Sequence, residues 1–226
     1  MLESTPFFNA RNRSESASGR LIGKRAFDLV LAVILLCLLL PLLVVSALLV
    51  RITSPGPVLF RQVRVGRFGR PFVMYKFRTM YEGSSDGIHR AYVSKLLTDE
   101  NPPAGGESGL FKLEADPRVT RVGGLLRRTS LDELPQLLNV VRGDMSLVGP
   151  RPALPWEVEL MGAAHERRLL VPPGLTGLWQ VSGRNFLTMR EGLALDLEYV
   201  RRQGFWFDLV ILLKTVPVVL FSGGAR

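Results

Sequence analysis

The sequence predicts an α+β protein that is mostly helical and contains one small β-hairpin. Three observations lead to this fold class. A long uncharged run, residues 29–50, has the composition of a membrane helix. Two short segments of β-branched and aromatic residues, 58–65 and 71–78, are typical of paired strands. The apolar residues Leu134, Leu137, Leu138 and Val141 recur at spacings of three and four, as in a helix that buries one face.

The chain has 226 residues, which allows one domain, or one domain with appendages. It carries 29 Lys and Arg against 20 Asp and Glu, a formal net charge of +9. This balance favours an anionic partner, such as nucleic acid, anionic lipid or a phosphorylated substrate. The single cysteine, Cys37, excludes an intramolecular disulfide, and the two histidines, His89 and His165, do not have zinc-site spacing.

A membrane segment is predicted at residues 21–51, after a polar and flexible N-terminus at 1–20. The 22 residues from Leu29 to Val50 carry no charge, and about 20 apolar residues are enough to cross a bilayer. A cleaved signal peptide is disfavoured, because its apolar region would run only roughly 7–15 residues and would lead to a small-residue cleavage site. This run ends in Arg51 instead.

Pro41 divides the apolar run. Proline has no backbone N–H, so the Cys37 carbonyl loses its helical partner and the helix should bend. Basic residues flank the run on both sides, and the positive-inside rule favours a cytoplasmic position for both flanks. The residues alone leave two topologies open with equal weight: a kinked span, and a re-entrant helix that bends at Pro41 and returns to the same side.

A cytoplasmic domain is predicted at residues 52–226. It begins with the hairpin, in which GRFGR supplies a glycine-containing loop between the two strands. Side chains alternate along a strand, so Lys76 and Arg78 share one face. Residues 82–113 are rich in Gly, Ser, Pro and acids, and we expect a mobile insertion there around a short helix at 88–97.

Further helical patterns occupy the second half of the chain. They are expected at 118–128 as a basic helical turn, at 155–168 and at 188–203. The last apolar segment, 205–221, has 17 residues and contains Asp208, Lys214 and Pro217. With two charges, it fits an interfacial amphipathic helix better than a membrane span.

An acid pair, Asp132 and Glu133, precedes an apolar run at helical spacing, which Gly143 could end as a C-cap. Ser130 with Glu133 matches a capping box, but Pro135 would then lie inside the helix. With Asp132 as the N-cap, Pro135 falls in the first turn, where its missing N–H matters little, and this register is preferred. In both registers the acids lie at a helix N-terminus, which favours carboxylates and bound phosphates alike.

Arg151 lies between Pro150 and Pro152 in the sequence GPRP. A residue before proline is pushed towards extended geometry, so the Arg151 guanidinium is pre-oriented. Such a guanidinium suits bidentate phosphate binding, while a surface polyproline turn explains the same residues equally well. First-turn acids are likewise common at helix starts. Acids able to hold a divalent cation, an arginine for phosphate oxygens and a membrane segment together indicate phosphoryl chemistry on a lipid.

The chain resembles the monotopic polyprenyl-phosphate phosphoglycosyl transferases, the bacterial sugar transferase family that starts surface-glycan assembly. The resemblance covers about 21–222 except the insertion, and it is to the small members. It rests on KRAFDLVLAVILLCLLLPLL, SPGPVLFRQVRVG, FVMYKFRTM, DPRVTRVGGLLRRTSLDELPQLLNVVRGDMSLVGPRP, PPGLTGLWQVSGRN and LDLEYV. It favours the re-entrant helix, although many members carry Ser-Pro at the break and this chain has Leu40-Pro41.

The resemblance implies a Mg²⁺-dependent enzyme. It would transfer a sugar-1-phosphate from a nucleoside diphosphate sugar, usually UDP-linked, to polyprenyl (undecaprenyl) phosphate and release UMP. The family's Asp-Glu dyad matches Asp132 and Glu133, so Asp132 would be the nucleophile that forms a covalent aspartyl-phosphosugar. Both acids are expected to bind the metal, and Glu133 would hold Mg²⁺ or take the proton of the incoming lipid phosphate.

The expected location is the cytoplasmic face of the bacterial inner membrane, where the protein would start assembly of exopolysaccharide, capsule, O-antigen or a glycoprotein glycan. Expected partners are the sugar nucleotide, polyprenyl phosphate and membrane lipid, and a homodimer is allowed. Basic strands with few exposed aromatic residues disfavour nucleic acid. Arg151 is the main candidate for binding phosphate. Weaker candidates for phosphate, uridine or sugar contacts, each equally compatible with a structural role, are Lys76, Arg78, Arg142, Gln180 and Arg184.

Two other classes of function stay open at this point. One is a basic membrane-bound scaffold without chemistry, which explains the charge and the anchor but not the acid pair beside a proline-flanked arginine. The other is an enzyme that transfers the sugar alone and keeps Asp132 only as a metal ligand. Release of UMP, of UDP or of neither nucleotide distinguishes the three classes.

Overall fold

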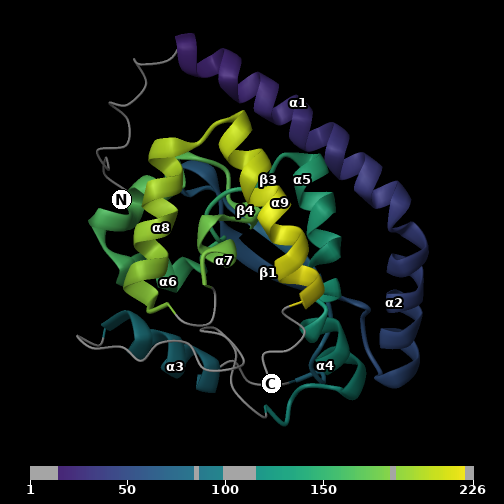
Figure 1. Cartoon of the computed structure of the whole chain (residues 1–226). Coiled ribbons are helices and arrows are strands. Elements are labelled where there is room, and N and C mark those ends of the chain that lie inside the picture. Colours follow the sequence, from purple (N-terminus) through teal and green to yellow (C-terminus); the bar gives the residue numbers. More distant parts are fainter. Residues whose placement is uncertain (1–14, 84–86, 99–115, 184–186, 222–226) are drawn as a thin grey trace.

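The computed structural model describes residues 15–83, 87–98, 116–183 and 187–221, and Figure 1 shows their arrangement. The helices are α1 (Glu15–Leu38), α2 (Leu40–Thr53), α3 (Gly87–Thr98), α4 (Arg121–Arg128), α5 (Leu137–Arg142), α6 (Pro155–Met161), α7 (Leu178–Val181), α8 (Met189–Arg202) and α9 (Phe205–Phe221). The strands are β1 (Leu59–Val65), β2 (Pro71–Phe77), β3 (Ser146–Val148) and β4 (Gly174–Thr176). The described residues also include the 3-10 helices η2 (Arg67–Gly69), η3 (Leu131–Gln136) and η4 (Ala163–Leu170). The predicted α+β class is confirmed.

The predicted hairpin is present as the antiparallel pair β1–β2. The register places Phe60 opposite Lys76, and Arg64 opposite Phe72. Residues directly opposite each other share a face of the sheet, so Arg64 and Lys76 point to the same side. They lie four residue steps apart along the strand, a separation of about 13 Å. One face of the hairpin therefore presents cations at both of its ends.

The apolar N-terminal run forms α1 and α2, which bend by 63° where they meet at Leu39. The Leu39 N–H still bonds to Leu35 O at 2.9 Å, whereas Pro41, at the start of α2, has no N–H to donate. The predicted break at Pro41 is confirmed. Across the described parts of the chain, no single helix is long and apolar enough to cross a membrane, but the bent pair passes this test by length and composition.

The start of the helix after the acid pair differs from the prediction. Asp132 is not its N-cap: Asp132 and Glu133 lie inside η3, and the α-helix α5 begins only at Leu137. Pro135 lacks the N–H that an α-helix would need there, so the chain takes a tighter 3-10 turn first. The alternative capping box is wrong too, since Ser130 is left-handed (φ 56°) and its side chain makes no capping hydrogen bond.

The predicted C-cap at Gly143 is confirmed. Gly143 has φ 91°, and its N–H donates to Asn139 O at 3.0 Å and to Val140 O at 3.1 Å. Arg25 of α1 completes this helix end, because its guanidinium donates to the carbonyl oxygens of Val140 and Val141. The last carbonyls of α5 are thus satisfied by a side chain from the N-terminal helix.

The other helices follow the sequence pattern, with one exception. Helices α3, α4, α8 and α9 confirm the predictions at 88–97, 118–128, 188–203 and 205–221. The single helix predicted at 155–168 is wrong: α6 ends at Met161, and η4 follows after Gly162. Gly162 has φ 67° and ψ 176°, a conformation that is open essentially only to glycine. The rest of the predicted insertion, apart from the residues of α3 and its immediate flanks, lies outside the described residues.

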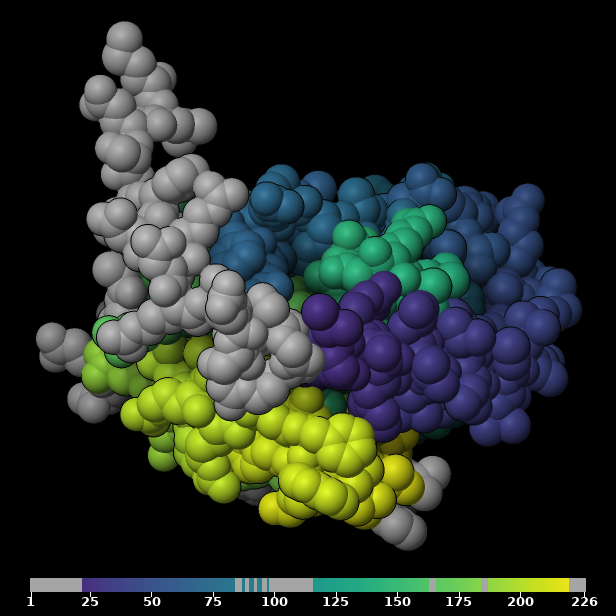
Figure 2. Space-filling model, turned by 90° about the horizontal axis from the view of Figure 1, so that it is seen from above, coloured from purple at the N-terminus to yellow at the C-terminus, as the bar shows by residue number. Residues whose placement is uncertain are grey.

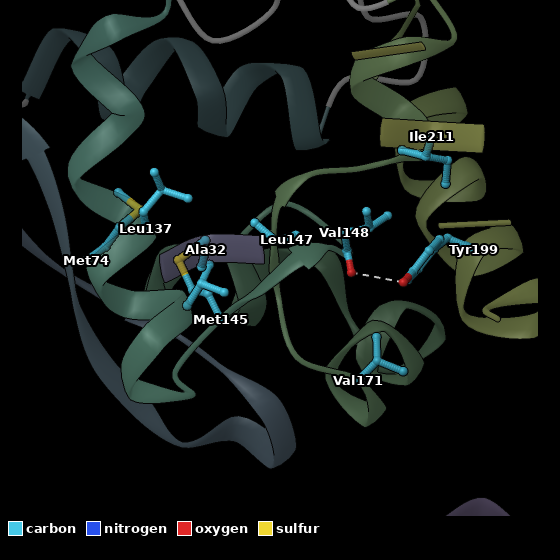
Figure 3. Close-up of a cluster of buried hydrophobic side chains, with 10 residues drawn as sticks. Ala32, Met74, Leu137, Met145, Leu147, Val148, Val171, Tyr199 and Ile211 are labelled. Carbon is cyan, nitrogen blue, oxygen red and sulfur yellow. Dashed lines mark hydrogen bonds between the residues drawn. The ribbon is translucent and has the colours of Figure 1, made fainter. Parts of the chain in front are cut away.

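One buried cluster joins the N-terminal helix to the body of the protein (Figure 3). It takes Ala32 from α1, Met74 from β2, Leu147 from β3, Tyr199 from α8 and Ile211 from α9. In the space-filling view, α1 lies against α5 on one side and α9 on the other (Figure 2). Helices far apart in the sequence thus share one core.

Buried polar groups add to this joint between α1 and α9. Lys24 forms an ion pair with Asp208, and the Tyr199 hydroxyl lies 2.8 Å from the same carboxylate. Asp28 accepts a hydrogen bond from Ser146 Oγ at 2.7 Å. The rings of Phe27 and Phe205 meet edge to face at 5.3 Å. The carboxylates of Asp28 and Asp208 are buried and paired, so they fix how α1 and α9 sit on the body.

Candidate active site

The acid pair lies on the cationic face of the hairpin. Glu133 Oε1 accepts a hydrogen bond from Lys76 Nζ at 2.8 Å, and both side chains are partly exposed. Asp132 is buried, with only 8% of the residue exposed. Helix η3 packs on β2, so the strand that carries Lys76 also positions the turn that carries the acids. The structure thus brings together three residues predicted from the sequence: Lys76, Asp132 and Glu133.

A second cation, Arg127, acts on the acid pair from α4. Burial lowers the pKa of the Arg127 guanidinium, and the nearby charge of Asp132 opposes this effect. The Arg127 Nε donates to Thr79 Oγ1 at 2.9 Å, which holds the side chain in place. Arg127 belongs to the basic helical turn predicted at 118–128, but the sequence did not indicate that it would act on the acid pair. The left-handed turn at Ser130 returns the chain towards α4, and no sequence pattern indicated that turn.

Arg78 is placed differently from Lys76. It is buried, with 6% of the residue exposed, and its Nη2 donates to Ser54 O and to Ser54 Oγ. Ser54 is the C-cap of α2. Arg78 therefore ties the end of the bent helix pair to the hairpin, and its proposed substrate contact stays a prediction.

Arg142 lies on the opposite face of the hairpin. Its Nη1 donates to the Tyr75 hydroxyl at 2.6 Å, and its guanidinium stacks on the Tyr75 ring at 4.9 Å from the centroid. Adjacent strand residues point to opposite faces. Arg142, the partner of Tyr75, and Glu133, the partner of Lys76, therefore lie on different sides of the hairpin. The structure does not bring Arg142 together with the acid pair.

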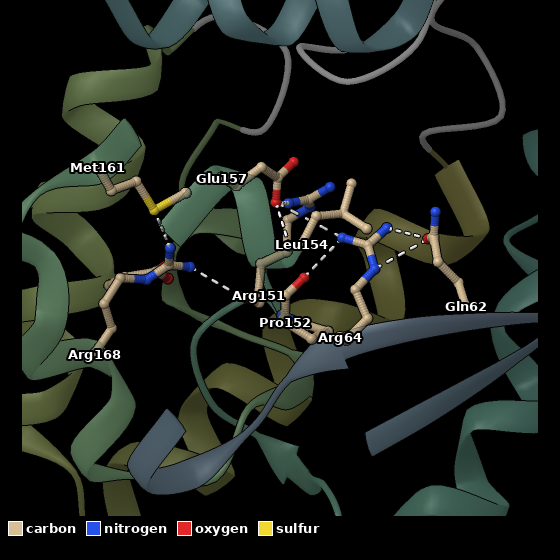
Figure 4. Close-up of polar contacts among 9 residues, drawn as sticks. Gln62, Arg64, Arg151, Pro152, Leu154, Glu157, Met161 and Arg168 are labelled. Carbon is tan, nitrogen blue, oxygen red and sulfur yellow. Dashed lines mark hydrogen bonds and ion pairs between the residues drawn. The ribbon is translucent and has the colours of Figure 1, made fainter. Parts of the chain in front are cut away.

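Arg151 lies near the other end of the cationic face (Figure 4). Its Nη1 contacts Glu157 Oε2 at 3.3 Å, and Arg64 Nη1 lies 3.7 Å from the same oxygen. Glu157 is fully buried. Burial alone would raise the pKa of the Glu157 carboxyl, but Arg151, Arg64 and the Leu154 N–H outweigh it and hold the pKa below its usual value. Glu157 is therefore a carboxylate that fixes the Arg151 guanidinium.

Gln180 lies beside the segment that carries Arg151. A Cβ on Gly177 would lie 2.7 Å from Gln180 Oε1 and also against Gly149 O. The Gln180 Oε1 atom is buried and has no hydrogen-bond partner within the described ranges. Gln180 and Arg151 thus lie close to the carboxyl ends of β4 and β3. Arg184, the last predicted contact residue, falls outside the described residues.

The carboxylate oxygens of Asp132 and Glu133 are suitable ligands for a Mg²⁺ ion that also binds the substrate. Mg²⁺ prefers one or two protein carboxylates together with phosphate and water oxygens. Asp132 and Glu133 supply two adjacent carboxylates, although Lys76 already binds one oxygen of Glu133. Nowhere in the described ranges do three or more His, Cys, Asp or Glu side chains form a group that could hold a metal ion. The residues therefore fit a metal bound together with phosphate, not one enclosed by protein alone.

Comparison with known proteins adds an independent finding. The profile of the bacterial sugar transferase family matches residues 19–222. The exopolysaccharide production protein ExoY of Rhizobium meliloti is 42% identical over 226 residues, which are 98% of this chain and 96% of that protein. The undecaprenyl-phosphate galactose phosphotransferase of Salmonella typhimurium is 43% identical over 95% of this chain and 44% of its own length. The UDP-glucose:undecaprenyl-phosphate glucose-1-phosphate transferase of Caulobacter vibrioides is 42% identical over 89% of this chain and 71% of its own length.

Proposed function

The chain belongs to the bacterial sugar transferase family, and from this membership we propose that it transfers a sugar-1-phosphate from a UDP-sugar to undecaprenyl phosphate through a covalent intermediate on Asp132. It is a polyprenyl-phosphate phosphoglycosyl transferase. The observation that carries the proposed mechanism is the acid pair between Lys76 and Arg127, in which Asp132 is buried and Glu133 is partly exposed. A nucleophilic carboxylate needs such surroundings, because it must approach a phosphate of like charge.

The reaction proceeds in two half-reactions on one phosphorus atom. An oxygen of Asp132 attacks the phosphorus that bears the sugar, the Asp132 O–P bond forms, and UMP leaves with the electrons of the broken P–O bond. An oxygen of undecaprenyl phosphate then attacks the same phosphorus, and the Asp132 carboxylate leaves. Covalent catalysis of this kind splits one difficult transfer into two easier steps.

The surrounding residues have separate roles in this scheme. Lys76 and Arg127 offset the charge of the acids and of the incoming phosphate. Arg151 binds the oxygens of the transferred phosphate, and Glu133 holds metal or takes the proton of the lipid phosphate. Mg²⁺, held by Asp132 and Glu133 together with the substrate, would neutralise charge on the diphosphate.

The names of the relatives suggest the donors to test first. The Caulobacter protein is named for UDP-glucose, and the Salmonella protein for galactose. The purified full chain should release UMP from UDP-glucose or UDP-galactose when undecaprenyl phosphate and Mg²⁺ are present, and should form a lipid-linked sugar diphosphate. Release of UDP would instead show transfer of the sugar alone. No turnover with any UDP-sugar would favour the scaffold.

We further propose that α1 and α2 enter the cytoplasmic face of the membrane and return to it. The apolar helix pair, its bend and its basic flanks support this topology. In a Cys37→Ser background, single cysteines at Ser18 and Arg70 should both be labelled by a membrane-impermeant maleimide only from the cytoplasmic side. Labelling of the Ser18 site from the opposite side would show a true span. Pro41→Ala, which restores the missing N–H, should shift the helix pair towards such a span.

A further inference from the structure

The backbone around Arg151 is held by donors from several distant elements (Figure 4). Four successive carbonyl oxygens each accept a hydrogen bond: Pro150 O from Gly174 N–H at 2.8 Å, Arg151 O from Arg168 Nη2 at 2.8 Å, Pro152 O from Arg64 Nη1 at 3.0 Å and Ala153 O from Val65 N–H at 2.9 Å. Two of the four donors are guanidinium groups. The prolines at 150 and 152 have no N–H, so this segment cannot form a regular strand ladder, and side chains take over part of that role.

Arg168 is itself fixed by a buried acid of α8. Its Nη2 lies 2.6 Å from Asp196 Oδ2, and the side chains are 4% and 0% exposed. Burial raises the pKa of Asp196 to about 6, although Arg168, Arg151 and the Arg151 backbone amide act against this rise. One ion pair thus acts on both backbone groups of Arg151. Arg168 donates to the Arg151 carbonyl oxygen, and the Arg151 amide acts on Asp196.

Glu157 acts on the side chain of the same residue. Its Oε2 accepts a hydrogen bond from Leu154 N–H at 2.7 Å and contacts Arg151 Nη1 at 3.3 Å. One carboxylate thereby fixes the guanidinium of Arg151 relative to the start of α6. Arg64, which donates to Pro152 O, also faces this carboxylate. The backbone and the side chain of Arg151 are therefore held by two separate buried acids.

Stability alone does not account for these buried charges. A buried ion pair pays a large desolvation penalty, and a well-packed apolar pair of similar volume is often at least as stable. What the charges provide is directional: each binds a particular backbone group or a particular nitrogen of Arg151. An apolar replacement would fill the space but would leave this arginine free to choose among rotamers.

We propose that Asp196, acting through Arg168, and Glu157 are positioning residues that hold Arg151 in the geometry in which it binds the transferred phosphate. This inference rests on the proposed function, in which Arg151 contacts that phosphate. Neither acid touches the substrate in this account. Their effect on catalysis passes entirely through Arg151.

A double-mutant cycle tests this dependence. Asp196→Asn keeps the shape of the side chain and removes its charge. We expect it to lower kcat for UMP release about tenfold in the parent protein. In an Arg151→Ala background, the same change should lower kcat less than twofold, because the group that Asp196 positions is gone. Glu157→Gln, which keeps an acceptor for Leu154 N–H, should show the same dependence and replaces Asp196→Asn if that variant does not fold.

Asp208→Asn is the matched control, because Asp208 is also a buried carboxylate with a cationic partner, Lys24. Asp208→Asn should change kcat for UMP release by the same factor in the parent protein and in the Arg151→Ala background, as expected for independent sites. Equal losses from Asp196→Asn in both backgrounds would overturn the proposal and leave a structural role, as would an unchanged kcat in the parent. Full activity of the Arg151→Ala variant would also overturn the proposal, because it would show that the reaction does not need Arg151. Failure of the proposed function is distinct, since the parent protein would then release no UMP.

Discussion

Asp132→Asn should abolish turnover, with a loss of at least roughly a thousandfold in UMP release. The amide has nearly the size of the carboxylate, so it fits the same position in the 3-10 turn that packs on β2. The loss would therefore come from chemistry. An amide oxygen is a far poorer nucleophile towards phosphorus, and it is also a poorer Mg²⁺ ligand.

The comparison with two further variants makes this test specific. Glu133→Gln should impair turnover severely but can still form some covalent intermediate if Glu133 serves mainly the second half-reaction. Asp144→Asn is the control, because Asp144 lies beyond the opposite end of α5 and contacts Asn139. It should keep activity within about twofold of the parent, as expected for a substitution away from the site. If Asp132→Asn turned over at nearly the parent rate, Asp132 would not be the nucleophile.

Arg151→Lys is expected to lower kcat/KM for UMP release by about tenfold or more, equivalent to about 1.4 kcal/mol per decade. Lysine keeps the positive charge but cannot present two parallel N–H groups to a phosphate. It also cannot contact Glu157 and a phosphate with the same planar geometry. The measurement is the initial rate of UMP release at varied UDP-sugar concentration.

Arg202→Lys provides the matched control for this change. Arg202 is an exposed arginine that pairs with Glu198 on the same helix, so the same substitution should leave kcat/KM within about twofold. A lysine variant at position 151 that turns over like the parent would show that bidentate geometry is not used there. That result would also contradict the proposal that Asp196 and Glu157 position Arg151.

Much of the fold follows from local pattern. The strand pair, α8 and α9 were predictable, because the composition and spacing of their own residues indicate these elements. The break in the N-terminal helix was predictable for a different reason: Pro41 removes a backbone donor wherever it lies. These features depend on the residues of one segment, so the rest of the chain has little influence on them.

The parts that could not be predicted depend on contacts between segments. Ser130 is left-handed where the chain passes from α4 into η3, which packs on both α4 and β2, so the capping pattern was misleading. The break at Gly162 is a single glycine with a rare conformation, which the helical pattern around it conceals. In the site, the acid pair, Lys76 and Arg151 were recognised from the sequence, but the other partners of the acid pair and of Arg151 were not. Arg127 and Glu157 are close to them in the sequence but lie on separate helices, α4 and α6, whereas Asp196 acts through Arg168 from the distant helix α8.

The central claim is that Asp132 carries the sugar phosphate between donor and acceptor. Its most direct test is the intact mass of the parent protein after incubation with a UDP-sugar and Mg²⁺, without undecaprenyl phosphate. We predict a mass increase of one sugar phosphate, which digestion maps to Asp132, together with a burst of UMP no larger than the amount of enzyme. Absence of both the adduct and the burst, in a preparation that turns over once lipid is added, would contradict the covalent mechanism and leave Asp132 a ligand in direct transfer.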